Sequence, residues 1–381
     1  MSHWWHKEIN LETKEYELGQ LLTYEQPTPY IVSSTKYSDK YKTPVLTAGK
    51  SFIIGYTDEE TGIYDRLPVI IFDDFTTSSK YVNFNFKVKS SAMKILTANT
   101  ELVLPKYIFY RMQIINIDHS THKRYWIQHY SKLKIQIPAV SVQEKIVQKI
   151  EELFSELDKS VETLQTIKQQ LAVYRQAVLK EAFEEITHYV HFGSCIDSRL
   201  GKMLDKEKNT GSFCKYLRNI NVRWFSFDLS DLLEMKIENS EMDKYTISKG
   251  DLVICEGGEP GRCAVWTKDE SICYQKALHR VRFTDGSNPY FYMYYLWFAA
   301  QTGKLKEYYT GTGIKHLTGQ SLVKISVPTV ERKQQDQIVK MIDSHLSVCD
   351  SIDQTLDTAL SQAEAMRQSI LKKAFEGGLI E

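Results

Sequence analysis

Three short fragments of the sequence contain residue types that could serve catalysis, and each lacks a residue that the chemistry needs. Residues 48–51 end like a phosphate-binding loop, but Pro44 stands where the first glycine is required, and proline has neither the N–H group nor the flexibility of that cradle. Residues 288–290, Asn-Pro-Tyr, lack the second proline of a motif that grips a base turned out of a duplex. Residues 73–74 offer two carboxylates for a metal-dependent nuclease, but Asn85 replaces the next one. We therefore expect no catalytic residue and no metal-binding residue in this chain.

The spacing of the cysteines and histidines likewise gives no sign of a metal-binding site. The six cysteines form no C-x-x-C pair, and the ten histidines show no H-E-x-x-H spacing. This usage is typical of reduced thiols in a cytoplasmic protein and argues against a disulfide framework or a zinc site. No apolar run reaches the roughly 18 residues of a transmembrane helix, and the first residues lack the apolar segment of a secretory signal. We expect a cytoplasmic protein.

The chemistry that remains is binding, because polar and basic residues gather in loops that follow predicted strands or precede predicted helices. Arginine and lysine can hydrogen-bond guanine and phosphate oxygens, and hydroxyl groups can bond phosphates or base edges. A tight turn or a solvated loop explains each segment about as well, and His279 could equally be a hydrogen-bonded core residue. The residues predicted to contact DNA are Thr76, Thr77, Ser79, Lys80, Lys123, Arg124, Tyr125, Arg262, Lys276, His279, Thr312, Lys315 and His316.

An internal repeat organises the elements that would position these loops. Residues 175–184 recur as residues 367–376 with seven of ten positions identical, at an offset of 192 residues. Residues 134–138 match residues 324–328 in the same order. Matches that stay in register along the chain favour duplication of one unit over two unrelated domains.

Each copy combines a mixed segment with a long helical segment. Strand-like apolar runs such as residues 69–72 and 278–283 are bounded by Gly, Pro, Asp and Ser. Residues 139–190 and 329–376 contain neither glycine nor proline, which predicts two uninterrupted helices.

Apolar residues recur three and four positions apart along both helical segments, as in a coiled coil. A helix of about 43 residues is about 65 Å long and needs a partner for its apolar stripe, which the other copy can provide. If the heads lie at opposite ends of this rod, the helices are antiparallel. The two seams are not identical, since Val161 aligns with Asp353 and Lys168 with Leu360. The predicted seam residues are Ile146, Ile150, Leu153, Leu157, Leu164, Leu171, Val178, Ile338, Ile342, Leu346, Leu356, Met366 and Ile370.

These patterns predict an α+β fold of two globular α/β domains joined by two long antiparallel coiled-coil helices, with a pseudo-twofold internal repeat. The predicted segments are a first head, residues 1–138; a first long helix, 139–190; a second head, 191–328; and a second long helix, 329–381. The chain has 48 basic and 48 acidic residues, but both heads are slightly basic and both helical segments slightly acidic. A coiled coil that only dimerises does not explain two similar, slightly basic heads.

The two heads resemble the target recognition domains of type I restriction–modification specificity subunits. Residues 250–266, GDLVICEGGEPGRCAVW, and residues 275–280, QKALHR, are similar to one such domain. Residues 44–51, 72–76 and 89–96 are similar to another. The repeated helices are similar to the two helical regions of that family, so the resemblance covers essentially the whole chain.

The resemblance implies that each head reads one half of a bipartite target in double-stranded DNA and that the helices fix the unread gap. It also implies that the helices dock two methyltransferase subunits, which bind S-adenosylmethionine, and that some assemblies add two restriction subunits with ATP-dependent nuclease and translocase activity. This chain would then hold no cofactor and be non-catalytic. The alternatives are the specificity subunit of a methylase-only or combined nuclease–methyltransferase system, a methyltransferase or nuclease in its own right, and a structural coiled-coil scaffold.

Overall fold

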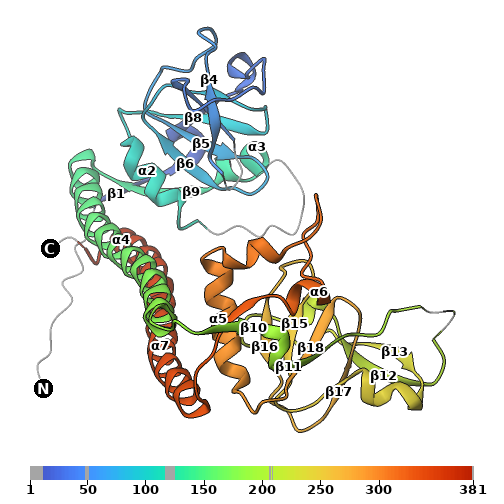
Figure 1. Ribbon diagram of the computed structural model, residues 1–381. Coiled ribbons are helices and arrows are strands. Elements are labelled where there is room, and N and C mark those ends of the chain that lie inside the picture. Colours follow the sequence, from blue (N-terminus) through green and yellow to red (C-terminus); the bar gives the residue numbers. More distant parts are fainter. Residues whose placement is uncertain (1–11, 48–50, 116–124, 206, 208, 380–381) are drawn as a thin grey trace, which may run out of the picture. The chain divides into compact units, whose positions relative to one another are not determined.

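Figure 1 shows the computed structural model, which describes residues 12–47, 51–115, 125–205, 207 and 209–379. The chain divides into two compact units, the first formed by Met1–Leu164 with Thr358–Glu381 and the second by Gln165–Asp357. Each unit contains a globular head and part of both long helices, which are α4 (Val140–Glu184) and α7 (Arg332–Phe375).

The first unit contains a four-stranded antiparallel sheet, β2-β8-β5-β6, and a three-stranded sheet, β4-β3-β7. The central strand β5 is buried on both faces: Ile70 and Phe72 join a core with α4 and α7, and the alternate residues join a core with the three-stranded sheet. Burial on both faces explains the continuous apolar sequence of this strand. Its elements are β1 (Thr13–Glu17), α1 (Leu18–Leu21), β2 (Leu22–Glu25), η1 (Thr28–Tyr30), β3 (Thr43–Leu46), β4 (Ile53–Thr57), β5 (Val69–Asp73), β6 (Ser79–Val82), β7 (Lys87–Val88), β8 (Met93–Ala98), α2 (Pro105–Met112), α3 (Tyr125–Gln128), η2 (Tyr130–Lys132) and β9 (Lys134–Pro138).

The second unit contains the sheets β11-β18-β15-β16 and β13-β12-β17-β14. Leu252 and Ile254 of the central strand β15 join a core with α4, α5 and α7, and the alternate residues join the core toward the other sheet. Its elements are β10 (Tyr189–His191), η3 (Phe192–Ser194), β11 (Ile196–Leu200), β12 (Ser212–Leu217), η4 (Asn219–Asn221), β13 (Leu233–Ile237), η5 (Asn239–Lys244), β14 (Thr246–Ile247), β15 (Leu252–Cys255), β16 (Cys263–Val265), β17 (Ile272–Tyr274), β18 (Leu278–Phe283), α5 (Pro289–Gln301), η6 (Lys304–Tyr308), α6 (Gly319–Leu322) and β19 (Ser326–Pro328).

The repeat predicted from the sequence is confirmed in the fold. The order β2-β8-β5-β6 in one head corresponds to β11-β18-β15-β16 in the other. The buried glutamines Gln143 and Gln335, 192 positions apart, make the same contacts. Each side-chain oxygen accepts the backbone N–H just before α2 or α5, from Leu104 at 2.9 Å and from Asn288 at 2.7 Å. Each side-chain amide also donates to the backbone carbonyl two residues before its own helix, that of Pro138 at 2.9 Å and that of Val330 at 3.0 Å.

The two long helices run antiparallel within each unit, as predicted. In the second unit, Lys168 of α4 pairs with Asp357 of α7. Arg175, further along α4, pairs with Asp350, which comes earlier on α7. In the first unit, Ile150 of α4 shares a core with Leu371 and Ala374 of α7. Asp158, further along α4, pairs with Arg367, which comes earlier on α7. Ion pairs between α4 and α7 include Asp158–Arg367, Lys168–Asp353, Lys168–Asp357, Arg175–Asp350 and Arg175–Asp353.

The structure buries, wholly or in part, most of the predicted seam residues. The predicted residues that are buried or half-buried are Ile146, Ile150, Leu153, Leu157, Leu164, Leu171, Val178, Ile338, Ile342, Leu346, Leu356 and Ile370. The prediction for Met366 is wrong, since its side chain is 55% exposed. Ala363 and Arg367 take the inner positions of that turn, and Arg367 lies over the Phe154 ring at 4.5 Å.

The four-part division of the chain stays a prediction, because the two compact units cut through both long helices. All six cysteines are free thiols, as expected. Of the helices in the described residues, none is both long and apolar enough to cross a membrane.

Candidate nucleic-acid interface

Three loops of the second head meet at Glu256, the first residue after β15. Its backbone N–H donates to the carbonyl oxygen of Ala277 at 2.9 Å, and its own carbonyl oxygen accepts from the N–H of Leu317 at 2.7 Å. The β15–β16 turn, the loop before β18 and the hairpin before α6 are therefore joined at one residue. We call this the Glu256 junction.

The Glu256 junction presents polar and basic side chains to solvent. The hairpin is closed by Thr310 and His316, whose backbone groups exchange hydrogen bonds of 2.8 and 2.9 Å. The Lys315 ammonium donates one bond to a carbonyl oxygen of the hairpin at 2.8 Å and keeps further N–H groups for a ligand. The predicted contact residues exposed at this junction are Lys276, Thr312, Lys315 and His316. Folding thus brings together residues that lie 40 positions apart in the chain.

Arg262, another predicted contact residue, braces the β15–β16 turn. Its guanidinium donates to the Glu259 carboxylate and to the carbonyl oxygen of Asn219, both at 3.0 Å. The side chain is only 16% exposed, so little of the guanidinium is open to a ligand. The turn needs this support because Gly258 and Gly261 adopt positive φ angles of 73° and 93°, and glycine adds no side-chain contacts of its own.

The prediction that His279 contacts DNA is wrong. Its side chain is 1% exposed, and Nε2 lies 2.9 Å from the carbonyl oxygen of Leu317. Burial lowers the pKa of the imidazole, which favours the neutral ring with the proton on Nε2. His279 therefore hydrogen-bonds to the end of the hairpin from its buried side.

In the first head, the β5–β6 turn presents the corresponding polar residues. The Asp73 carboxylate accepts the backbone N–H of Phe75 at 2.9 Å, and Thr77 has a φ of 59°, which together form a tight turn. Thr76 and Lys80 are exposed and Thr77 is half-buried. A threonine and a lysine are thus available here, as at the Glu256 junction.

Two other predictions in this head are corrected, and two lie outside the described residues. Ser79 is 6% exposed, and its hydroxyl accepts a hydrogen bond from Gln113 at 2.8 Å. Tyr125 is 2% exposed, because it begins α3 inside the core. Neither side chain can reach a ligand from solvent. Lys123 and Arg124 precede α3 outside the described residues.

The residues that join the loops in both heads were not among those predicted from the sequence. In the first head, the carbonyl oxygen of Asp74 accepts the N–H of Tyr125 at 3.0 Å, and in the second Glu256 accepts that of Leu317. The Asp74 carboxylate also accepts the N–H of Trp126 at 2.8 Å. The available signal was an acidic residue placed directly after an apolar strand in both copies.

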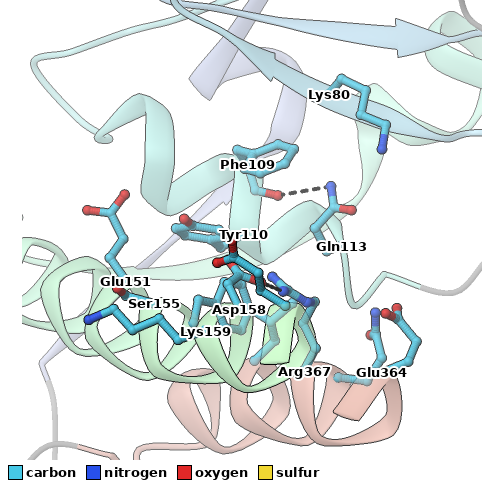
Figure 2. A pocket seen from close by; sticks show the side chains of 14 residues that line it. Lys80, Phe109, Tyr110, Gln113, Glu151, Ser155, Asp158, Lys159, Glu364 and Arg367 are labelled. Carbon is cyan, nitrogen blue, oxygen red and sulfur yellow. Dashed lines mark hydrogen bonds and ion pairs between the residues drawn. The ribbon is translucent and has the colours of Figure 1, made fainter. Parts of the chain in front are cut away.

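A groove of about 700 Å³ lies in the first unit beside α2, α4 and α7, and Figure 2 shows the side chains that line it. Burial raises the pKa of Tyr110 to about 12, with a further contribution from its hydrogen bond to Glu151. Arg367 is ion-paired with Asp158 across the two helices, and Lys80 also lines the groove. Charges of both signs line this surface, so it lacks the positive character that attracts a phosphate backbone. No cluster of side chains in the described residues could hold a metal ion.

Comparison with known sequences gives a consistent set of relatives. Residues 203–362 match the family model described as Type I restriction modification DNA specificity domain. The chain is 47% identical over 154 residues to the type I restriction enzyme EcoR124I/EcoR124II specificity subunit of Escherichia coli, which covers 39% of this chain and 38% of that protein. It is 25% identical over 271 residues to the EcoKI specificity subunit of Escherichia coli strain K12, covering 66% and 58%. These matches span less than two thirds of each relative's length.

Two solved structures share the fold over nearly the whole chain. A chain from a structure of the type I R-M system, concerned with its complex assembly and conformational transition, matches with a TM-score of 0.73 at 16% identity and covers 97% of this chain and 100% of that one. The HsdS subunit from Thermoanaerobacter tengcongensis matches with a TM-score of 0.55 at 17% identity, covering 96% and 97%. The α+β fold with two long helices is the fold of these proteins.

Proposed function

We propose that this chain, a relative of the specificity subunits of type I restriction enzymes, recognises DNA by sequence and directs partner subunits to it. The observation that carries the proposal is the repeated junction of loops at Asp74 and Glu256. Each junction lies at the end of a buried central strand and exposes a lysine and a threonine nearby. Two similar readers in one chain suit a target of two half-sites, one for each head.

Among the exposed side chains, the lysines contribute to affinity and the threonines can contribute to specificity. Lys80 in the first head and Lys276 and Lys315 in the second supply positive charge to phosphates, which gives salt-dependent affinity. Thr76 and Thr312 supply hydroxyl groups that can bond base edges or phosphates. A well-placed bidentate side chain distinguishes the right base from a wrong one by about 1–3 kcal/mol.

The proposed partners follow from the relatives, which are subunits of restriction enzymes. In this proposal the chain is a non-catalytic, cytoplasmic subunit that docks two methyltransferase subunits, with or without two restriction subunits. S-adenosylmethionine would then be bound by the methyltransferase partner. A methylase-only or a combined nuclease–methyltransferase partner fits the same chain. The slightly acidic helical segments support a role in protein contacts rather than phosphate contacts.

A head exchange tests the proposal directly. Residues 191–328 are replaced by the second head of a relative with a known target, and the methylated sequences of a host that carries the chain with its partner are read. We expect one half-site to change while the other half-site and the gap persist.

The exchange has two contrary outcomes. A change in both half-sites would contradict the division of labour between the heads. Methylation of DNA by the purified chain alone would identify an enzyme instead of a recognition subunit. A parallel exchange of residues 1–138 serves as the matched control and should alter the opposite half-site.

A further inference from the structure

The hairpin at the Glu256 junction carries an exposed isoleucine at its tip. Ile314 is 75% exposed, more than any other large apolar side chain among the described residues. It lines a hollow of about 530 Å³ together with Lys315, the β15–β16 turn, which includes Glu259, the end of α5, and Tyr309. Exposing an apolar side chain to water is unfavourable, and at this position it contributes little to the core.

The base of the hairpin that carries Ile314 is tied by backbone hydrogen bonds. Two backbone hydrogen bonds close the hairpin, and a third ties its end to Glu256. His316 packs closely against Gly257, since a Cβ on that glycine would lie 3.1 Å from the His316 ring. Gly311 adopts a φ of 94° and its missing side chain makes room for the Ile314 carbonyl oxygen. The fold therefore presents an apolar side chain to solvent at the end of a closed hairpin.

Two groups that can bind nucleic acid flank the tip. Gly313 precedes Ile314 and has open space around it, so no neighbouring side chain blocks the approach. Lys315 and Thr312 flank the tip with an ammonium and a hydroxyl group. Apolar side chains that proteins insert between base steps are presented in this way, with polar groups on the backbone of the DNA.

We propose that Ile314 inserts between stacked bases of the half-site that the second head binds and distorts the duplex there. This inference rests on the proposed function, because it assumes that the second head binds DNA. A hairpin that is already closed before binding lowers the entropic cost of insertion. Ile314 is then a residue that determines specificity through the deformability of the base step, in addition to the hydrogen bonds of its neighbours.

The test uses the full-length chain, with its methyltransferase partner, and duplexes that carry 2-aminopurine at successive positions of the half-site. We expect the wild-type complex to raise the fluorescence at one step, because the base there loses its stacking. Ile314→Ala should abolish most of that rise and weaken binding about tenfold, because the shortened side chain no longer buries apolar surface between the bases. Leu233→Ala is the matched control, since Leu233 is a 45% exposed aliphatic residue on the other sheet of the same head, and should change neither quantity.

Each contrary result has a distinct meaning. If Ile314→Ala binds as tightly as wild type with the same fluorescence, the insertion is overturned while the proposed function stands. If replacing thymine by uracil weakens wild-type binding as much as Ile314→Ala does, without any fluorescence change, Ile314 contacts a thymine methyl group and the insertion is again overturned. If the wild-type complex shows no sequence preference at all, the proposed function itself fails.

Discussion

Individual side chains at the Glu256 junction have different structural roles, which their residue types alone do not reveal. Lys276 and Lys315 face solvent, whereas His279 lies beneath the hairpin and Arg262 braces a turn. The basic residues that remain exposed are the ones that can form phosphate contacts. Their contribution can be separated from that of the supporting residues by salt dependence.

Replacing Lys315 with alanine should weaken DNA binding and reduce its dependence on salt. One lost phosphate contact lowers the slope of log affinity against log salt by about 0.9. Fluorescence anisotropy of a labelled duplex at several salt concentrations measures the slope. Lys249→Ala is the control, since Lys249 is an exposed lysine of the same head that pairs with Asp269. Equal slopes for Lys315→Ala and wild type would remove this lysine from the interface.

The buried imidazole of His279 should make stability depend on pH. Burial lowers its pKa in the folded state, so below about pH 6.5 the unfolded chain binds a proton that the folded chain does not. Its contribution to stability is therefore present above that pH and is lost as the pH falls. Urea unfolding at pH 7.5 and 5.5 should show a smaller loss on acidification for His279→Gln than for wild type. An identical loss in both would show that His279 does not titrate in this way.

At the scale of elements, the long helices combine an apolar seam with paired charges that follow the repeat. Arg175 pairs with Asp350, and Arg367, 192 positions later, pairs with Asp158. The motif that revealed the repeat thus begins with an arginine that contacts the other helix in both copies. The seams differ at Asp353, which lies between Lys168 and Arg175 in the second unit.

Whether a helix residue is buried in the seam, more than its residue type, should decide how far its substitution lowers the free energy of unfolding. Leu356 is 6% exposed, so Leu356→Ala should lower the free energy of unfolding by about 2–5 kcal/mol through lost burial and a cavity. Met366→Ala removes a side chain that is 55% exposed and should change it by less than about 0.5 kcal/mol. Chemical denaturation of both variants measures the difference. Similar losses would mean that Met366 is in the seam after all.

At the scale of the whole molecule, the proposal gives the helices the task of setting the gap between half-sites. Removing four residues from each helix, at facing positions, shortens each by about 6 Å, which is close to the rise of two base pairs. We expect methylation at sites with a gap about two base pairs shorter and an unchanged sequence in both half-sites. Removing four residues from one helix only is the control and should disrupt the seam. If the double deletion kept the original gap, the helices would not set the distance between the half-sites.

Local chemistry made much of the fold predictable. The absence of glycine and proline from two long segments left nothing to end a helix, and the apolar run at residues 69–72 required a buried strand. The repeated decapeptide placed the two halves in register. The meeting of three loops at Glu256 could not be predicted, because it depends on contacts between residues about 20 to 60 positions apart in the chain.

The sequence by itself determined the duplication, the helical segments and the loops rich in polar residues, because periodicity and composition act over a few neighbouring residues. Only the tertiary structure decided which side chains of those loops face outward. His279, Ser79 and Tyr125 carry hydrogen-bonding groups, as Lys276 and Thr312 do, yet the fold buries the first three and exposes the others. The physical reason is that burial is a property of the packed chain: a polar group turns inward where a distant partner satisfies its hydrogen bonds or its ring fills the core, and outward where none does.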